Sequence, residues 1–245
     1  MGTNLLSLPD DLLLGRRTFG IFDDFDYLEE QESGSTGRWN TIETGSGAAI
    51  STAAGVGGAA TVQTGSADND DAYLYSNEIF LFADGKPLVA EMRMKYTEAN
   101  TDDANVVFGV MDAITADTTL LVDGGGPDNT YDGACFFKID GGTNWNVEAS
   151  DNTTQITHEL NATNSLDGLA KACSDTASYQ VFQIKIQPTS STRMDVSFLI
   201  DGTLVKKIDS TYTSPTEMAV VVGAMAGAGN AEALTVDYLS AYQLR

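Results

Sequence analysis

Side chains suited to nucleophilic or metal chemistry are few in this sequence. His158 is its one histidine, so a histidine metal cluster, a Ser-His-Asp triad or a Cys-His pair would each need this residue. It lies in the alternating segment TTQITHEL, without a nucleophile elbow, which favours a surface or half-buried strand histidine. The triplet Gly124-Gly125-Gly126 has no lysine or serine at the offset that a phosphate-binding loop requires. These patterns support neither nucleophilic catalysis nor phosphate binding.

Carboxylates are the second group that could do chemistry, because β-sandwich glycosidases place two acids on alternate residues of one strand. No such run occurs: Glu91 has Arg93 as its neighbour on the same face, and Asp195 shares its face with Ser197. Acids on distant strands can still meet in a fold, which keeps a polysaccharide-degrading enzyme as an alternative. The sequence predicts a protein without enzymatic activity.

Calcium is the one cofactor for which the sequence offers ligands, since Ca²⁺ prefers oxygen donors in loops. Acidic residues gather in the run Asp68-Asn69-Asp70-Asp71, in the pair Asp102-Asp103 and in the loop from Asp123 to Asp132. Counted from Asp68, the run lacks the glycine and the glutamate of an EF-hand at positions six and twelve. We predict solvated turns held by Asx hydrogen bonds and no bound cofactor, with Ca²⁺ as the alternative.

Sugar binding without catalysis needs exposed aromatic rings. Tyr73 and Tyr75 share one face of the segment AYLYSNEIF, and Tyr131 lies in a glycine-rich loop, so these three are the candidate glycan-binding residues. Aromatic residues at such positions more often pack inside the protein, which is the alternative for all three. Trp145 shares its strand face with Val147, which favours a place in the core. The pattern around Trp39 does not indicate whether its ring is buried or exposed.

Period-two alternation predicts the strands that must position these side chains. Apolar residues share one face of the segment 87–96 and charged residues the other, and the segment 179–187 alternates in the same way. The segments 105–111 and 218–225 are apolar on both faces, which predicts central strands covered by a second sheet or a loop. No segment after residue 20 has an apolar pattern at helical spacing over three turns. The chain is therefore predicted to be all-β.

Turn residues agree with antiparallel strands. Asp201-Gly202 separates DVSFLI from TLVKKID, and Asp140-Gly141-Gly142 separates ACFFKI from TNWNVEA; Asp-Gly adopts positive φ at low cost. The segment 45–66 has nearly all small residues and is interpreted as thin, closely packed strands, with a flexible linker as the alternative. We predict one two-layer antiparallel β-sandwich over residues 20–245.

Residues 1–19 depart from the strand pattern and are predicted to form an N-terminal arm. Ser7, followed by Pro9 and Asp10, could start a short helix that ends near Gly15; the alternative is a terminal element that folds back on its own domain. The basic pair at positions 16 and 17 follows the leucines, which is the wrong order for a signal peptide. The candidate partner-binding residues of this arm are Leu5, Leu6, Leu8, Leu12, Leu13 and Leu14.

The charge and the cysteines exclude several classes of function. With 35 acidic and 13 basic side chains the net charge is −22, which opposes binding to DNA and to anionic membranes. No stretch approaches the roughly 20 apolar residues of a membrane helix. Cys135 and Cys173 form no CxxC motif and are interpreted as reduced thiols of a cytoplasmically made protein, with one disulfide as the alternative.

Three segments, taken in order, resemble laminin-G-like and concanavalin-A-like jelly rolls. Asp23-Asp24-Phe25 resembles the opening strand of that fold, VSFLIDGTLVKKID its late hairpin and LTVDYLSAYQ its closing strand. The resemblance covers residues 20 to 243. It implies that the first and last strands of the chain pair with each other.

A narrower similarity is to virion proteins of tailed bacteriophages. It is carried by the segments 68–113, 132–148 and 161–168, which look like head proteins made beside the major capsid protein. The resemblance implies a capsid decoration or cement protein that is synthesised in the host cytoplasm and binds the major capsid protein on the virion exterior. We expect a symmetric homo-oligomer, without nucleic acid or membrane as a partner. The alternative function is a carbohydrate-binding module, on a virion or secreted.

Overall fold

The computed structural model describes residues 18–28, 37–54, 57–98, 103–112, 114, 120–128, 130–152, 154–173, 176–212 and 217–245. Within these ranges the chain forms strands and no helix, which confirms the all-β prediction. None of these residues belongs to a helix that could cross a membrane. Of the predicted arm, residues 1–17, including all six candidate leucines, lie outside the described residues.

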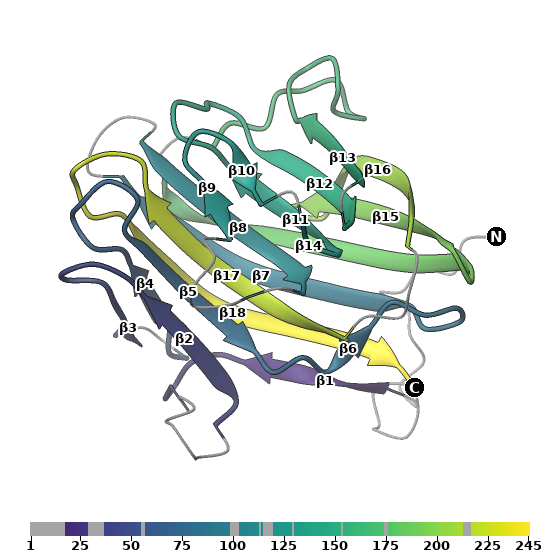
Figure 1. Ribbon diagram of the computed structural model, residues 1–245, viewed down its shortest axis with the longest axis horizontal. Coiled ribbons are helices and arrows are strands. Elements are labelled where there is room, and N and C mark those ends of the chain that lie inside the picture. Colours follow the sequence, from purple (N-terminus) through teal and green to yellow (C-terminus); the bar gives the residue numbers. More distant parts are fainter. Residues whose placement is uncertain are drawn as a thin grey trace.

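Two antiparallel sheets stack face to face, as Figure 1 shows. The first sheet has the strand order β16-β15-β14-β7-β18-β4-β3, with β1 also paired to β18. Its strands are β1 (Thr18–Asp23), β3 (Ala49–Thr52), β4 (Ala60–Gln63), β7 (Leu88–Thr97), β14 (Thr176–Ser190), β15 (Arg193–Ile200), β16 (Thr203–Thr211) and β18 (Ala233–Leu244).

The second sheet has the order β13-β12-β11-β8-β17-β5-β2, with β6 also paired to β17. Its strands are β2 (Trp39–Glu43), β5 (Asp71–Ser76), β6 (Phe80–Leu81), β8 (Ala104–Met111), β11 (Gly133–Lys138), β12 (Asn146–Asp151), β13 (Thr154–Glu159) and β17 (Glu217–Ala226). A small hairpin of β9 (Leu121–Val122) and β10 (Gly126–Pro127) stands in the connection from β8 to β11.

The first and last strands pair, as the jelly-roll resemblance implies. The register runs from Thr18 opposite Leu244 to Asp23 opposite Leu239, and Figure 1 shows β1 alongside β18. The predicted boundary at residue 20 is wrong by two residues, because Thr18 and Phe19 are already in β1. Phe19 also stacks on Phe80, with ring centroids 5.9 Å apart, so it belongs to the sandwich.

The main core lies between the sheets and follows from the predicted alternation. Every second residue of β7 from Leu88 to Tyr96 is buried, and the residues between them are partly exposed. Phe136 of the second sheet meets Phe182 and Phe198 of the first, each with ring centroids 5.2 Å apart. Trp145 is buried against Phe182, as predicted.

The two strands predicted to be covered on both faces, β8 and β17, are adjacent in the middle of the second sheet. All eight residues of β8 are buried. One face packs on the core, and the other packs on the connection from β8 to β11, so the second sheet is covered by both a sheet and a loop.

The predicted turns and thin strands are also present. Asp201 and Gly202 have φ values of 49° and 76° between β15 and β16, which is the conformation that Asp-Gly favours. Gly142 N donates to Ile139 O at 2.9 Å in the turn after β11. The small-residue segment contains the paired strands β3 and β4, which confirms the interpretation as thin strands.

Candidate functional site

The outer face of the second sheet is covered by the chain itself. Residues Ile114, Leu120, Leu121 and Tyr131 of the β8–β11 connection form a second buried cluster with residues of β5, β8, β11 and β17. A sheet face that is open to solvent can present a platform for a ligand, but this face holds packed apolar side chains. The described part of the connection therefore occupies the space above the middle of this sheet.

The β8–β11 connection determines how much of each candidate tyrosine is exposed. Tyr73 and Tyr131 are each 1% exposed, and Tyr75 is half-buried at the border of the same cluster. The hydroxyl oxygen of Tyr73 accepts a hydrogen bond from Leu121 N at 3.3 Å. As candidate glycan-binding residues Tyr73 and Tyr131 offer no exposed ring, because the connection buries both, and Tyr75 has only a partial surface. The alternative of packing inside the protein describes Tyr73 and Tyr131.

Beneath the cover lies a buried polar group around Glu148 of β12. The Tyr131 hydroxyl donates to Glu148 Oε1 at 2.7 Å, and the Thr157 hydroxyl donates to the other carboxylate oxygen. Burial raises the pKa of Glu148, and these two hydrogen bonds partly oppose that rise. Burial also raises the pKa of the Cys135 thiol, which lies 3.5 Å from the Tyr131 oxygen.

A carboxyl with a raised pKa can act as a general acid where a substrate can reach it. Both oxygens of Glu148 accept hydrogen bonds from within the protein, from the hydroxyls of Tyr131 and Thr157. The group therefore ties the connection to β12 and β13. It was missed in the sequence because Glu148 alternates as a solvent-facing strand residue.

The raised pKa values of four carboxyl groups predict that the protein is more stable in mild acid. Burial raises the pKa of Asp71, Asp112, Asp140 and Glu148 above the ordinary values. A raised pKa means that the folded chain binds more protons than the unfolded chain, so stability rises as the pH falls through the folded values. Protonation also reduces the repulsion of a chain with net charge −22.

We therefore expect a higher Tm at about pH 5.5 than at about pH 8 in a thermal scan at constant ionic strength. The hydrogen bond from Lys171 lowers the pKa of Asp167, which acts in the opposite direction, but Asp167 lies at the surface and its effect is screened. A Tm that is higher at about pH 8 than at about pH 5.5 contradicts the expectation.

Two of the three predicted calcium segments meet at one end of the second sheet. The Asp123 and Asp103 carboxylates lie close enough to Asp140 to help raise its pKa, after the larger effect of burial. The Asn105 amide oxygen accepts a hydrogen bond from Asp140 N at 2.8 Å, and the Asn105 amide nitrogen lies 3.5 Å from Asp123 Oδ1. Asp102 lies outside the described residues.

These residues do not form a metal centre. Across the described ranges no group of three or more His, Cys, Asp or Glu side chains is placed to hold a metal ion. In the third segment Asp70 accepts from Ala67 N at 2.9 Å, and Asp71 accepts from the Thr44 hydroxyl at 2.6 Å. These hydrogen bonds are of the kind that the turn interpretation predicts.

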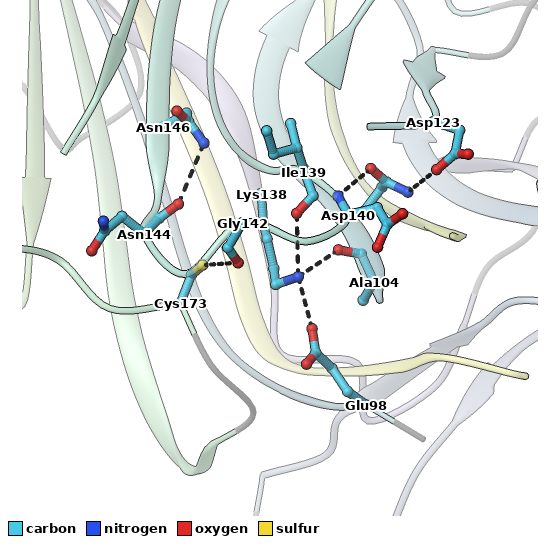
Figure 2. A network of polar contacts seen from close by, with 11 residues as sticks. Glu98, Ala104, Asp123, Lys138, Ile139, Asp140, Gly142, Asn144, Asn146 and Cys173 are labelled. Carbon is cyan, nitrogen blue, oxygen red and sulfur yellow. Dashed lines mark hydrogen bonds and ion pairs between the residues drawn. The ribbon is translucent and has the colours of Figure 1, made fainter. Parts of the chain in front are cut away.

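A buried ion pair lies beside the acidic residues in Figure 2. Lys138 Nζ of β11 is 2.9 Å from Glu98 Oε1, and their side chains are 0% and 2% exposed. The ammonium group also donates to Ala104 O at 2.8 Å. Sequence reasoning missed this pair, although a lysine directly after the apolar run ACFF is a signal of a buried charge.

The remaining candidates are structural. His158 is half-buried on β13, as predicted, and burial and the nearby Lys206 lower its pKa. Cys135 and Cys173 are both buried and form no disulfide, which agrees with the interpretation as reduced thiols.

The outer face of the first sheet, by contrast, is open at the edge formed by β1 and β18. Phe22 is 53% exposed and Tyr242 39% exposed, and Tyr238, on the same strand as Tyr242, is half-buried. We call Phe22, Tyr238 and Tyr242 the aromatic strip. Alternation around these positions did not single them out in the sequence, because exposure at an edge depends on what the rest of the chain leaves uncovered.

Comparison with solved structures identifies the fold. The carbohydrate recognition domain of Emp47p has a TM-score of 0.56 at 15% identity, with 98% of each chain covered. A β-glucanase of Bacillus licheniformis has a TM-score of 0.54 at 13% identity, covering 90% of this chain and 96% of its own. A protein of unknown function from Shewanella oneidensis has a TM-score of 0.56 at 12% identity, covering 100% and 97%.

No protein-family model matches the chain, and no curated protein matches it. Lectin domains and a glucanase thus share one arrangement of strands with this chain at low identity, which establishes the fold alone. The protein has the concanavalin-A-like and legume-lectin-like β-sandwich jelly roll that its opening, hairpin and closing segments predict.

Proposed function

We propose that this protein is a non-enzymatic component of a tailed-phage virion that binds the major capsid protein on the capsid exterior. The observation that carries the proposal is the covered outer face of the second sheet, where Glu148 accepts hydrogen bonds from within the protein and apolar residues of the connection pack on the strands. The similarity of the segments 68–113, 132–148 and 161–168 to phage head proteins supports the placement on a virion. The strongly acidic chain remains soluble at high copy number and is repelled by the packaged genome.

Co-sedimentation with capsid shells of the major capsid protein encoded beside its gene tests this proposal. We expect saturable binding at a fixed ratio to capsid subunits at both low and high salt, because an apolar contact is little screened. Failure to sediment with the shells in both conditions contradicts capsid binding. Light scattering on the free protein tests the expected homo-oligomer.

The arm is the part proposed to make the contact, since leucines at a chain end can reach a partner surface. The appropriate deletion removes residues 1–17, because β1 begins at Thr18. We expect this deletion to abolish saturable binding while the Tm stays within a few degrees.

A matched control separates arm binding from general hydrophobic adhesion. Leu166 and Leu169 are 58% and 62% exposed on the sandwich, so Leu166→Ser with Leu169→Ser removes exposed leucines of another segment. Serine at all six arm leucines should reduce capsid binding, and the control should not. Equal binding by the six-serine variant and the intact chain argues against the arm.

A second candidate function is carbohydrate binding, and the aromatic strip is the observation that favours it. One structural neighbour is a carbohydrate recognition domain, and the strip offers exposed rings on the sheet face that the chain leaves open. An enzyme acting on polysaccharide is the remaining alternative, and reducing-sugar assays on a polysaccharide panel test it. Release of reducing sugar that a single Asp or Glu substitution abolishes contradicts a non-enzymatic role.

A further inference from the structure

Resting on the carbohydrate-binding candidate, we propose that the aromatic strip on the first sheet is a binding site for neutral saccharides. Its three residues come from the two ends of the chain, which the pairing of β1 with β18 brings together. Gly20 lies opposite Tyr242 and Phe22 lies opposite Ser240. The side chains of Phe22 and Tyr242 therefore stand as diagonal neighbours on one face of the sheet, within reach of a single ligand.

Gly20 leaves room for Tyr242 and its backbone. A Cβ atom at position 20 would stand 2.0 Å from Ala241 O and 2.7 Å from Tyr242 Cδ1, which is closer than atoms of this kind approach. The Tyr242 ring thus lies over the position on β1 that has no side chain, and it remains 39% exposed. A ring held in this way presents an apolar surface without losing further conformational freedom on binding.

Phe22 is also held in place. Its ring stacks on Tyr238 with centroids 6.2 Å apart and an interplanar angle of 25°. Phe22 remains more than half exposed in this position, so the contact orients the ring and does not bury it. The strip therefore offers two ordered apolar surfaces that suit the hydrocarbon faces of pyranose rings.

Ordered polar groups adjoin the two rings. Glu91, the neighbour of Ser240 across the strand pair, accepts hydrogen bonds from the Tyr238 hydroxyl at 2.8 Å and from Gln183 Nε2 at 2.6 Å. Each carboxylate oxygen has a second lone pair, so Glu91 can still accept from a ligand hydroxyl. Apolar surface beside a few fixed polar groups is the composition of a small-molecule site, and it matches the two kinds of surface of a sugar.

The charge of the protein narrows the class of ligand. At net charge −22 the chain repels anionic ligands such as acidic glycans, whereas a neutral saccharide carries no electrostatic cost. The cationic side chain of Arg93 is paired with Asp237 and stacks on Tyr179 at 4.2 Å, so it is not a free anion site. Since each ring can contact one sugar unit, the proposed ligand is a neutral oligosaccharide of two or more units.

Titration calorimetry of the full chain with neutral gluco-, manno- and galacto-oligosaccharides tests the proposal. We expect weak, saturable binding to at least one of them, reduced about tenfold by Tyr242→Ala and by Phe22→Ala, with an unchanged Tm. Leu204→Ala is the matched control, because Leu204 is 42% exposed on β16, the far edge strand of the same sheet. The Leu204→Ala variant should bind the oligosaccharide with the same affinity as the intact chain.

Three results overturn the proposal, and they differ in what else they affect. If no oligosaccharide binds, both the proposed site and the proposed carbohydrate-binding function are contradicted. The proposal of capsid binding is not affected by that result. If binding occurs but neither ring substitution weakens it, the carbohydrate function stands and the site is elsewhere. If Tyr242→Ala or Phe22→Ala dissociates an oligomer in light scattering, the strip is an interface between copies of the chain.

Discussion

Replacing Lys138 with methionine is expected to lower the free energy of unfolding by about 3–5 kcal/mol, because it removes one partner of a buried ion pair. The Glu98 carboxylate, whose side chain is 2% exposed, would lose the ammonium group 2.9 Å away. Ala104 O would lose a donor at 2.8 Å in the same step. Methionine retains most of the apolar volume, so the loss reports the unpaired charge and carbonyl and not a cavity.

Urea unfolding followed by fluorescence measures this loss, and a thermal scan should show a Tm lower by roughly 10 °C. The matched control is Lys207→Met, which breaks the ion pair between Lys207 and Asp195. The two charged groups lie 2.7 Å apart, but the Lys207 side chain is half exposed. That variant should lose less than about 1 kcal/mol. Adding Glu98→Leu to Lys138→Met should recover much of the stability, since no unpaired charge then remains. Equal losses for the two lysines would show that the pair at Glu98 is not buried in solution.

Replacing Phe136 with alanine is expected to cost about 3–5 kcal/mol, because its fully buried ring joins the two sheets. The ring makes edge-to-face contacts with Phe182 and Phe198, each at 5.2 Å between centroids. Phe182 is itself packed against Trp145, with ring centroids 4.8 Å apart, so the wall of the cavity cannot collapse readily.

The same unfolding experiment checks this cost. Phe22→Ala removes an identical side chain that is 53% exposed, and its loss should be within about 0.5 kcal/mol of zero. Phe136→Leu should fall between the two, because leucine refills part of the cavity. A loss below about 1 kcal/mol for Phe136→Ala would contradict the packing of the two sheets through this ring.

Much of the fold could be predicted because its causes are local. The alternation from Leu88 to Tyr96 sets which face of β7 is buried, and it does so through neighbouring residues alone. The turn at Asp201-Gly202 depends on the φ values that these two residues adopt cheaply.

The candidate site could not be predicted in the same way. Tyr131 stands in a glycine-rich loop and Glu148 in an alternating strand, and neither pattern shows whether the side chain is covered. They are buried because a connection between β8 and β11 lies across the second sheet and brings Tyr131 to Glu148. No local pattern describes where a connection of this length lies, so the sequence left both an exposed and a packed Tyr131 open and did not indicate its contact with Glu148.

The sequence by itself determined the all-β class, the strands, the turns and the strong negative charge, because each follows from residue type and short spacing. Only the tertiary structure decided which of the two outer faces is open. The burial of Lys138 with Glu98 and the meeting of Phe22 with Tyr238 and Tyr242 depend on contacts between residues far apart in the chain. Exposure is a property of what the remainder of the chain covers, and that is set by packing across the whole sandwich.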